Sequence, residues 1–177
     1  MQRLLVFLLL AAMCCLNGCA YGLYEDQRLM DTIVDDKAMA SAIKSDLLKE
    51  DFTEGWSVVV YCYYKNVFLV GEVPENMQYK ALETARRHKP LSVTPHWFAQ
   101  ARSKVSDIEL AATLRKELIG AKGLSSTRID TEVNAGRVVL LGVVKNDEEK
   151  RLAVQAARRT NGVRSVASYL MLPQRIK

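Results

Sequence analysis

The chain repeats one pattern of apolar and polar positions. The apolar run Val67–Val73 returns 71 positions later as Val138–Val144, and each run holds one glycine, Gly71 or Gly142. A short β-rich run of this kind predicts a buried strand. A glycine inside it marks a bulge or a place where a helix packs closely, so we interpret both glycines as structural. The repeat predicts two similar units.

The repeat also includes the helices. Residues 36–48 align with residues 107–119 at the same offset, and residues 85–87 align with residues 157–159 at an offset of 72. Each unit is predicted to run helix, strand, strand, helix, strand, which is an α+β fold with two helices packed on a small three-stranded mixed sheet. Units of about 65 residues bury only small cores, so we expect the two units to pack against each other.

Turn and cap signals are clearest in the second unit. Ser106 with Glu109, and Asn146 with Glu149, have the spacing of a capping box at a helix start. The sequence Asn-Ala-Gly at residues 134–136 predicts the turn of the strand hairpin. These signals fix the expected ends of both helices and the register of the first two strands.

Two features bear on how the units meet. Polar and apolar side chains alternate along residues 128–133, so one face of the second sheet is expected to be solvated or covered through polar contacts. The linker at residues 100–105 contains neither Gly nor Pro, which indicates adjacent, packed units. Residues 174–177 form a short C-terminal tail.

The pattern resembles the BON domain. The resemblance rests on the first helix, on a hairpin whose second strand ends in apolar-Gly-x-Val, on the acidic helix start at residues 146–149, and on the strand entry Gly162–Val166. The first unit lacks this entry and carries Pro95, which belongs on a sheet edge. Lipoproteins with two BON domains are the most similar group. The resemblance implies tandem BON domains at 35–99 and 106–173, phospholipid binding, a role in envelope integrity and no catalytic site.

The start of the chain has the features of an exported lipoprotein. Residues 1–18 hold a basic head and a nine-residue apolar run, Leu4–Ala12, which is too short to span a bilayer. They end in Leu-Asn-Gly before Cys19, the arrangement of a bacterial lipobox, so we expect a signal peptide and acylation, for example by palmitate, at Cys19. An ordinary cleaved signal is the alternative. Residues 19–34 then form the lipidated start and a tether. Ala20, by resemblance to enterobacterial lipoproteins, favours the outer membrane with the protein facing the periplasm.

Charge separates the two units. The chain holds 25 Lys and Arg against 20 Asp and Glu; residues 35–101 hold 8 against 9, and residues 102–177 hold 15 against 8. A cationic unit on a tethered chain is expected to face anionic phospholipid, phosphatidylglycerol or cardiolipin, and not nucleic acid. The outer-membrane assembly machinery is a further candidate partner.

The predicted lipid site lies on the helix at residues 107–120. Its core stripe consists of Leu110, Ala111, Leu114 and Leu118. A second stripe mixes apolar and cationic side chains and consists of Ile108, Ala112, Arg115 and Ile119, with Lys116 and Lys122 beside it. Such a strip can lie at the headgroup boundary while its cations reach phosphates. The alternative is that Ile108 and Ile119 pack against the first unit.

Candidates for other chemistry are few. His88 and His96 have no His or Cys at ligand spacing, and no nucleophile or phosphate-loop motif occurs, so no catalytic residue, cofactor or metal is expected. Cys62 is expected to be a small buried side chain. The acidic residues at 147–149 are explained by the helix dipole. Arg158 with Arg159 fits the same explanation and is the second candidate for phosphate contact.

Two functions remain open on the sequence. The leading hypothesis is a non-enzymatic lipoprotein that binds anionic phospholipid through the second unit. The alternative is a periplasmic chaperone or assembly factor that binds outer-membrane proteins through its basic face and strand edges.

Overall fold

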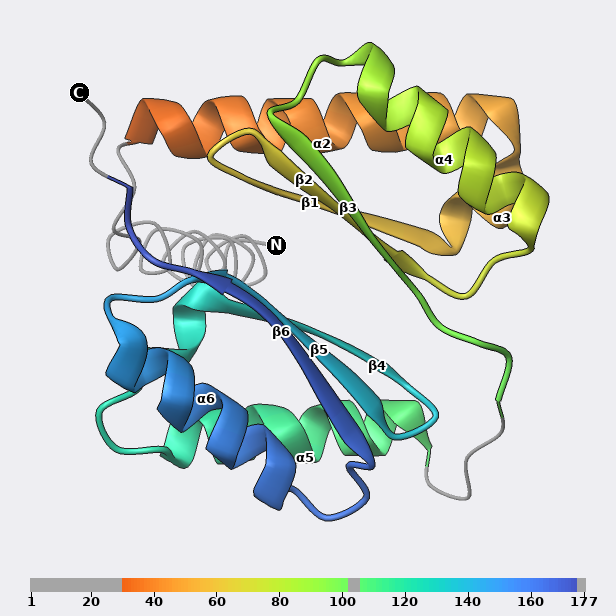
Figure 1. Cartoon of the computed structure of the whole chain (residues 1–177). Coiled ribbons are helices and arrows are strands. Elements are labelled where there is room, and N and C mark those ends of the chain that lie inside the picture. The colour runs from red at the N-terminus through yellow and green to blue at the C-terminus, as the bar shows by residue number, and fades with distance from the viewer. Residues whose placement is uncertain (1–29, 102–105, 175–177) are drawn as a thin grey trace, which may run out of the picture.

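The structure, a computed structural model, describes residues 30–101 and 106–174 of the 177-residue chain. Two units of the same topology follow one another, each with helices on one face of a three-stranded sheet (Figure 1). The signal segment, Cys19 and residues 102–105 of the linker lie outside the described residues. Within the described ranges, no helix is long and apolar enough to cross a membrane.

The first unit begins earlier than the sequence predicts. It consists of α2 (Met30–Glu50), α3 (Phe52–Trp56), β1 (Val58–Tyr63), β2 (Asn66–Gly71), α4 (Glu75–Arg87) and β3 (Ser92–Trp97). Residues 30–34, which were expected in the tether, are therefore helical. The Ile33 side chain is buried and anchors this extra turn. Helix α3 has no counterpart in the prediction. Asp51 caps its start by accepting the Glu54 N–H at 3.0 Å.

The second unit follows the predicted order. It consists of α5 (Asp107–Gly120), the short 3-10 helix η1 (Ser126–Arg128), β4 (Ile129–Asn134), β5 (Arg137–Val143), α6 (Asp147–Arg159) and β6 (Ser165–Met171). The predicted cap at α6 is confirmed, because the Asn146 side chain accepts the Glu149 N–H at 2.9 Å. The capping box predicted at Ser106 is wrong, since its side chain makes no cap hydrogen bond. Asp107 ties this helix start to the hairpin instead, by accepting the Ala135 N–H at 3.0 Å.

Both sheets are mixed, as predicted. In each, the middle strand is antiparallel to the strand before it and parallel to the last one, so the orders are β1-β2-β3 and β4-β5-β6. Pro95 lies in the edge strand β3, where its missing N–H interrupts no sheet. The predicted hairpin turn is confirmed, with Ala135 and Gly136 at φ +47° and +80°.

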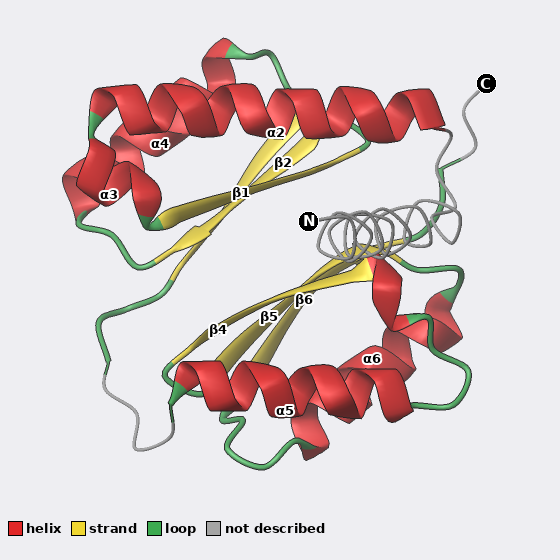
Figure 2. Cartoon of the chain, turned by 180° about the vertical axis from the view of Figure 1, so that it is seen from behind, coloured by secondary structure: helices red, strands yellow, loops and turns green. Residues whose placement is uncertain are grey.

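The two sheets pack face to face, so the molecule has the layer order helices, sheet, sheet, helices (Figures 1 and 2). In β2, Val67 and Leu69 point to the helices of their own unit. The alternating Phe68 and Val70 point to the other sheet. Strand β5 divides its side chains in the same way. Burial on both faces explains why each central strand is a continuous apolar run.

The contact between the sheets also has polar parts. The Tyr61 hydroxyl donates to Glu132 Oε1 and the Tyr63 hydroxyl donates to Asp130 Oδ2, each at 2.5 Å. Burial is the main cause that raises the pKa of both Tyr61 and Glu132 above their usual values. The polar face of the second sheet is thus covered through polar contacts, which was one of the two predicted outcomes.

Candidate functional site

Helix α5 presents the predicted stripe on the outside of the sandwich. Its core residues Leu110, Leu114 and Leu118 are buried, and the last two pack in one cluster with side chains of β4 and β5. Ile108 is 83% exposed and Ile119 is 65% exposed, which is unusual for side chains of this size. The alternative that these two isoleucines pack against the first unit is therefore wrong, because the units meet through their sheets and α5 lies in the outer layer.

The cations of the stripe divide into two groups. Lys116 and Lys122 are exposed and lie three positions before and three positions after Ile119 in sequence. Arg115 is also exposed, but its Nη1 donates to the carbonyl oxygens of Ser126 at 3.1 Å and Ile129 at 2.9 Å. Arg115 therefore holds the 3-10 turn against α5, a structural task that the sequence prediction did not include.

The first unit has the same clamp at the equivalent position. Lys44, 71 residues before Arg115, donates from Nζ to the carbonyl oxygens of Gly55 at 2.8 Å, Trp56 at 2.9 Å and Val58 at 2.6 Å. Partial burial lowers the pKa of this ammonium group. The repeat thus preserves a cation that satisfies the carbonyl groups at the end of a turn.

A groove of about 620 Å³ runs between α2 and the edge strand β1. Its wall on α2 consists of Lys37, Ala40, Ser41, Lys44, Ser45, Leu48 and Lys49. At an offset of 71, four of these positions correspond to the predicted lipid stripe of α5, namely Ile108, Ala112, Arg115 and Ile119. The two units therefore present the same helix face, and the face is more cationic in the first unit and more apolar in the second.

The two repeated glycines allow a close approach between backbones. A Cβ on Gly71 would lie 2.3 Å from the Ser57 carbonyl oxygen, and one on Gly142 would lie 2.0 Å from the Arg128 carbonyl oxygen. Gly142 also has φ +130°, which favours glycine. The close neighbour is the backbone that enters the adjacent strand, so the expected helix contact is not what requires these glycines.

The sequence did not predict a buried ion pair that Arg128 and Glu149 form in the second unit. The Arg128 Nη2 donates to both oxygens of Glu149, at 2.7 and 2.9 Å, and both side chains are largely buried. From the sequence, Glu149 was assigned to a capping box and to the helix dipole, and its side chain also accepts the Lys145 N–H at 2.7 Å. Arg128 precedes a strand whose sequence alternates, and nothing in that pattern predicts an inward-facing guanidinium.

The other candidates for chemistry have structural partners. His88 Nε2 lies 3.0 Å from Asp46 Oδ2, and His96 Nδ1 lies 3.0 Å from the Tyr169 hydroxyl. Cys62 is buried, as predicted, with its sulfur 3.3 Å from Asp36. In the part of the chain that the structure describes, no group of three His, Cys, Asp or Glu could hold a metal ion.

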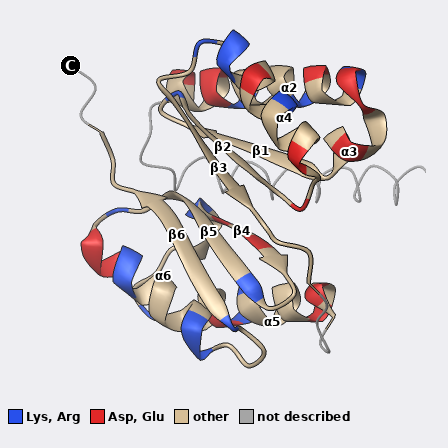
Figure 3. Ribbon diagram, turned by 45° about the vertical axis from the view of Figure 1, so that its right-hand side comes forward, with Lys and Arg blue, Asp and Glu red and all other residues tan. Residues whose placement is uncertain are grey.

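Arg158 and Arg159, the second candidate for phosphate contact, end a helix that begins with acidic residues. Helix α6 carries Asp147, Glu148 and Glu149 in its first turn and the two arginines in its last turn (Figure 3). Both arginines are exposed. This placement complements the helix dipole. Helix α6 lies behind α5 on the same face of the sheet (Figure 2), so the arginines are on a different helix from the isoleucine stripe.

Comparison with known proteins assigns part of this architecture to a family. Residues 106–172 match the family model of the BON domain. One BON domain is therefore found in the second unit, and it contains α5 with the whole exposed stripe. The first unit shares the topology, but the family match does not extend to it.

Comparison with whole chains adds little. No curated protein sequence matches the chain. A solved structure of the C-terminal domain of CdsD, a structural protein of the type III secretion system of Chlamydia trachomatis, has a TM-score of 0.33 at 15% identity, with 78% of this chain and 67% of that chain covered. A second CdsD structure gives 0.33 at 14%, with 77% and 63% covered. At these scores the likeness supports no inference.

Proposed function

We propose that the protein is a non-enzymatic outer-membrane lipoprotein, anchored through Cys19 and facing the periplasm, that binds anionic phospholipid through its BON domain and supports envelope integrity. The observation that carries the proposal is the outer face of α5. There Ile108 and Ile119 are exposed at 83% and 65%, beside the exposed Lys116 and Lys122. BON domains are generally linked to phospholipid or membrane binding.

The chemistry of this face suits a lipid surface. Isoleucine side chains lose water when they enter the boundary between headgroups and acyl chains, at a gain of roughly 25 cal/mol for each Å² of apolar surface buried. Lysines beside them reach anionic headgroups, and each contributes about 1 kcal/mol near such a surface. Because Arg115 is engaged with two carbonyl groups, we assign the headgroup contact to Lys116 and Lys122.

Flotation with lipid vesicles tests the proposal. The soluble form that starts at Ala20 is expected to float with vesicles that contain phosphatidylglycerol or cardiolipin, and not with vesicles of phosphatidylcholine alone. Lys116→Glu with Lys122→Glu should abolish flotation without lowering the melting temperature, because both side chains are exposed. A matched control is Arg158→Glu with Arg159→Glu on α6, which should float as the wild type does. Loss of flotation in this control alone would move the site to α6.

The anchor is tested separately. Cys19→Ala in the full chain is expected to release the protein from the membrane fraction or to block its maturation. If this variant fractionates with the outer membrane as the wild type does, the proposed anchor is wrong.

The exposed strand edges favour a second candidate function, polypeptide binding. Strands β1 and β4 are each at the edge of their sheet, and β1 borders the groove along α2. An extended segment of an outer-membrane protein could add to such an edge, as an assembly factor or chaperone requires. Binding of unfolded outer-membrane protein that survives Lys116→Glu with Lys122→Glu would favour this function over the first.

A further inference from the structure

Two aromatic side chains of the first unit project into solvent. Phe52 is 72% exposed and Trp56 is 68% exposed, although both rings are large and apolar. They occupy the two ends of the short helix α3, and their ring centroids lie 6.4 Å apart. Phe52 and Trp56 together form the aromatic pair of this unit. Exposed apolar pairs of this kind mark a surface that meets another phase or molecule.

The aromatic pair is held in place by its surroundings. Lys44 donates to the carbonyl oxygens of Gly55 and Trp56, and its Nζ lies 5.6 Å from the centroid of the Trp56 indole. Gly55 is packed so closely against α2 that a Cβ there would lie 2.4 Å from the Leu47 carbonyl oxygen. The short helix is thus fixed on α2, and its aromatic side chains face outward on a rigid base.

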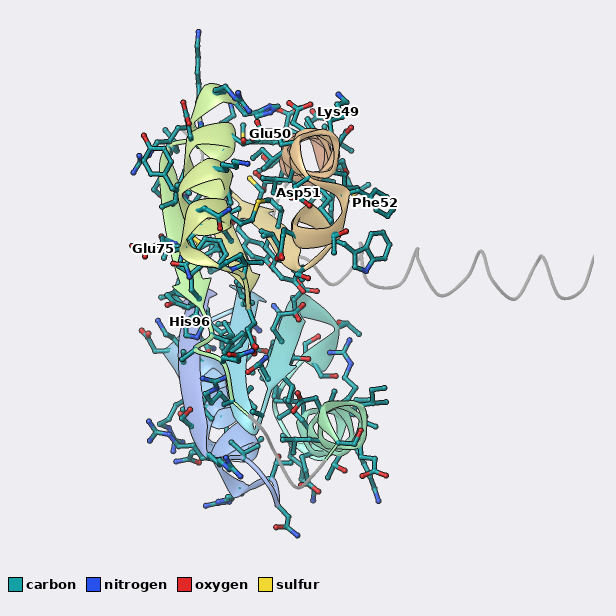
Figure 4. All side chains as sticks on the ribbon, turned by 90° about the vertical axis from the view of Figure 1, so that its right-hand side faces the viewer. Lys49, Glu50, Asp51, Phe52, Glu75 and His96 are labelled. Atoms are coloured by element: carbon teal, nitrogen blue, oxygen red, sulfur yellow. The ribbon has the colours of Figure 1, made fainter. Side chains whose placement is uncertain are left out.

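The aromatic pair lies on the same side of the molecule as the stripe of α5. Seen from behind, α2, α3 and α5 all lie in front of the two sheets, with α4 and α6 behind them (Figure 2). The side view agrees, since Phe52 on α3 and the helix α5 project toward the same side, away from α4 and α6 (Figure 4). A flat surface placed on this side can touch both units at once.

The groove along α2 carries a net positive charge. The groove beside β1 is lined by Lys37, Lys44 and Lys49 and by no acidic residue. Asp46 pairs with Lys49 of the groove at 2.9 Å and also lies 3.0 Å from His88, so the positive charge of the groove comes from Lys37 and Lys44. Glu50 turns toward α4, where it accepts from Thr84 at 2.9 Å and from Arg87. The side that carries the aromatic pair is therefore cationic where it borders α2, which suits an anionic surface.

We propose that the aromatic pair is a second membrane contact, which inserts at the headgroup boundary of the same anionic bilayer that α5 meets. Tryptophan and phenylalanine rings prefer this boundary, where one end of the indole stays hydrated. Two contacts on one rigid body act together, so each raises the apparent affinity of the other. The inference rests on the proposed function and extends it to the first unit.

Fluorescence of Trp56 tests the proposal directly. The full-length, acylated protein carries Trp97→Phe, so that Trp56 is its one tryptophan, and it is reconstituted into vesicles that contain phosphatidylglycerol. The emission of Trp56 is expected to shift to shorter wavelength. Phospholipids brominated on their acyl chains should quench it by about twofold relative to unbrominated lipid, because the indole enters the boundary region. Unshifted, unquenched emission from protein that floats with the vesicles would overturn the proposal.

A tryptophan on the opposite side provides the matched control. Tyr79 on α4 is 69% exposed, as Trp56 is, but α4 lies on the far side from α3 (Figure 4). A chain with Trp56→Phe, Trp97→Phe and Tyr79→Trp is expected to show no quenching by brominated lipid. Equal quenching at both positions would also overturn the proposal, since the bound protein would then have no fixed face.

Flotation separates this inference from the proposed function. In the soluble form, Phe52→Ser with Trp56→Ser should weaken binding to phosphatidylglycerol vesicles by about tenfold, because one of two linked contacts is lost. Ile108→Ser with Ile119→Ser should weaken it at least as much. Loss on changing α5, without loss on changing the aromatic pair, would keep the proposed function and reject the inference. Full-length protein that does not stay with the vesicles would reject both.

Discussion

At the residue scale, Gly142 shows how closely two backbones approach in this fold. The glycine combines φ +130° with a position at which a Cβ would lie 2.0 Å from the Arg128 carbonyl oxygen. Either feature alone disfavours a side chain. Both features occur in the central strand β5, so a side chain at this position fits only if the backbone just before β4 moves.

Gly142→Ala is therefore expected to destabilise the protein by about 3 kcal/mol, the sum of backbone strain and overpacking of typical size. Chemical denaturation measures this as a lower free energy of unfolding. Gly120→Ala at the end of α5 is the control, because a Cβ there has no atom within 4 Å, and it should be neutral or slightly stabilising. Equal stability of the two variants would contradict the structural role of Gly142.

The ion pair between Arg128 and Glu149 is the second residue-scale feature. Removing one partner leaves a buried charge without its counterpart, so Glu149→Met alone should cost about 3 to 5 kcal/mol. The first unit fills the equivalent positions with Ser57 and Met77, and Met77 is buried. The double variant Arg128→Ser with Glu149→Met has the residues of the first unit at both positions. Its stability should be closer to that of the wild type than the stability of the single variant is. A thermal melt of the wild type and both variants decides this, and a double variant no more stable than Glu149→Met would refute it.

At the element scale, the clamp between the first helix and the following turn recurs in both units. Lys44 and Arg115 each donate to carbonyl groups that end a short helix. The Gly55 and Ser126 carbonyl groups also accept the backbone N–H that ends the short helix, so the cation is an added donor that fixes the turn against the long helix. In the second unit the clamp also sets the position of the stripe proposed to meet lipid.

Arg115→Gln is expected to lower the free energy of unfolding by about 1 to 2 kcal/mol, because two hydrogen bonds from a charged donor are lost. The neighbouring Lys116→Gln is the matched control and should leave stability within about 0.5 kcal/mol, as for other exposed substitutions. Urea denaturation compares the two. If Arg115→Gln is as stable as Lys116→Gln, the clamp contributes nothing and the residue is free for headgroup contact.

At the scale of the whole molecule, the duplication produces a nearly two-fold contact. Tyr61 and Glu132, which are hydrogen-bonded, occupy equivalent positions 71 residues apart. Phe68 and Tyr169 join the sheets through rings 5.6 Å apart. Equivalent faces that meet in this way bury the polar side of both hairpins. The contact also holds the stripe of α5 and the aromatic pair on one side.

Acidification is expected to weaken this contact through His96. Burial, and next the nearby Arg137, lower the pKa of the His96 ring, which lies 3.0 Å from the Tyr169 hydroxyl. As the pH falls through about 6.5, the unfolded chain takes up a proton at this residue before the folded chain does. The stability that neutral His96 provides is fully present above pH 6.5. It is lost as the pH falls from that value to the lowered pKa of His96 in the folded chain. Glu132, whose pKa burial raises, contributes with the opposite sign as the pH falls through that raised pKa.

Free energies of unfolding between pH 8 and pH 5.5 test this for the wild type and for His96→Gln. The wild type should lose more stability over this range than the variant does, and the difference isolates His96 from other titrating groups. If the free energies of unfolding of the two proteins change in parallel with pH, His96 does not contribute to the pH dependence of stability.

Sequence periodicity was sufficient for most of the fold. The offset of 71 predicted two units, the order of their elements and the continuous apolar strands, because each of these depends on local pattern and on burial of both strand faces. The exposed stripe of α5 was found because a helix has a fixed period, so Ile108, Ala112 and Ile119 fall on one side whatever packs on the other. Capping was less reliable, since Ser106 has the right spacing and makes no bond.

By itself, the sequence determined the elements, the duplication and the list of candidate lipid contacts, since these follow from side-chain periodicity along one chain. Tertiary structure decided which side chains are available. It placed Ile108 and Ile119 in solvent, assigned Arg115 to a turn and buried Arg128 with Glu149. It also brought the aromatic pair Phe52 and Trp56 to the side of α5. These outcomes depend on contacts between residues far apart in sequence, and no local pattern records which face of each sheet its partner covers.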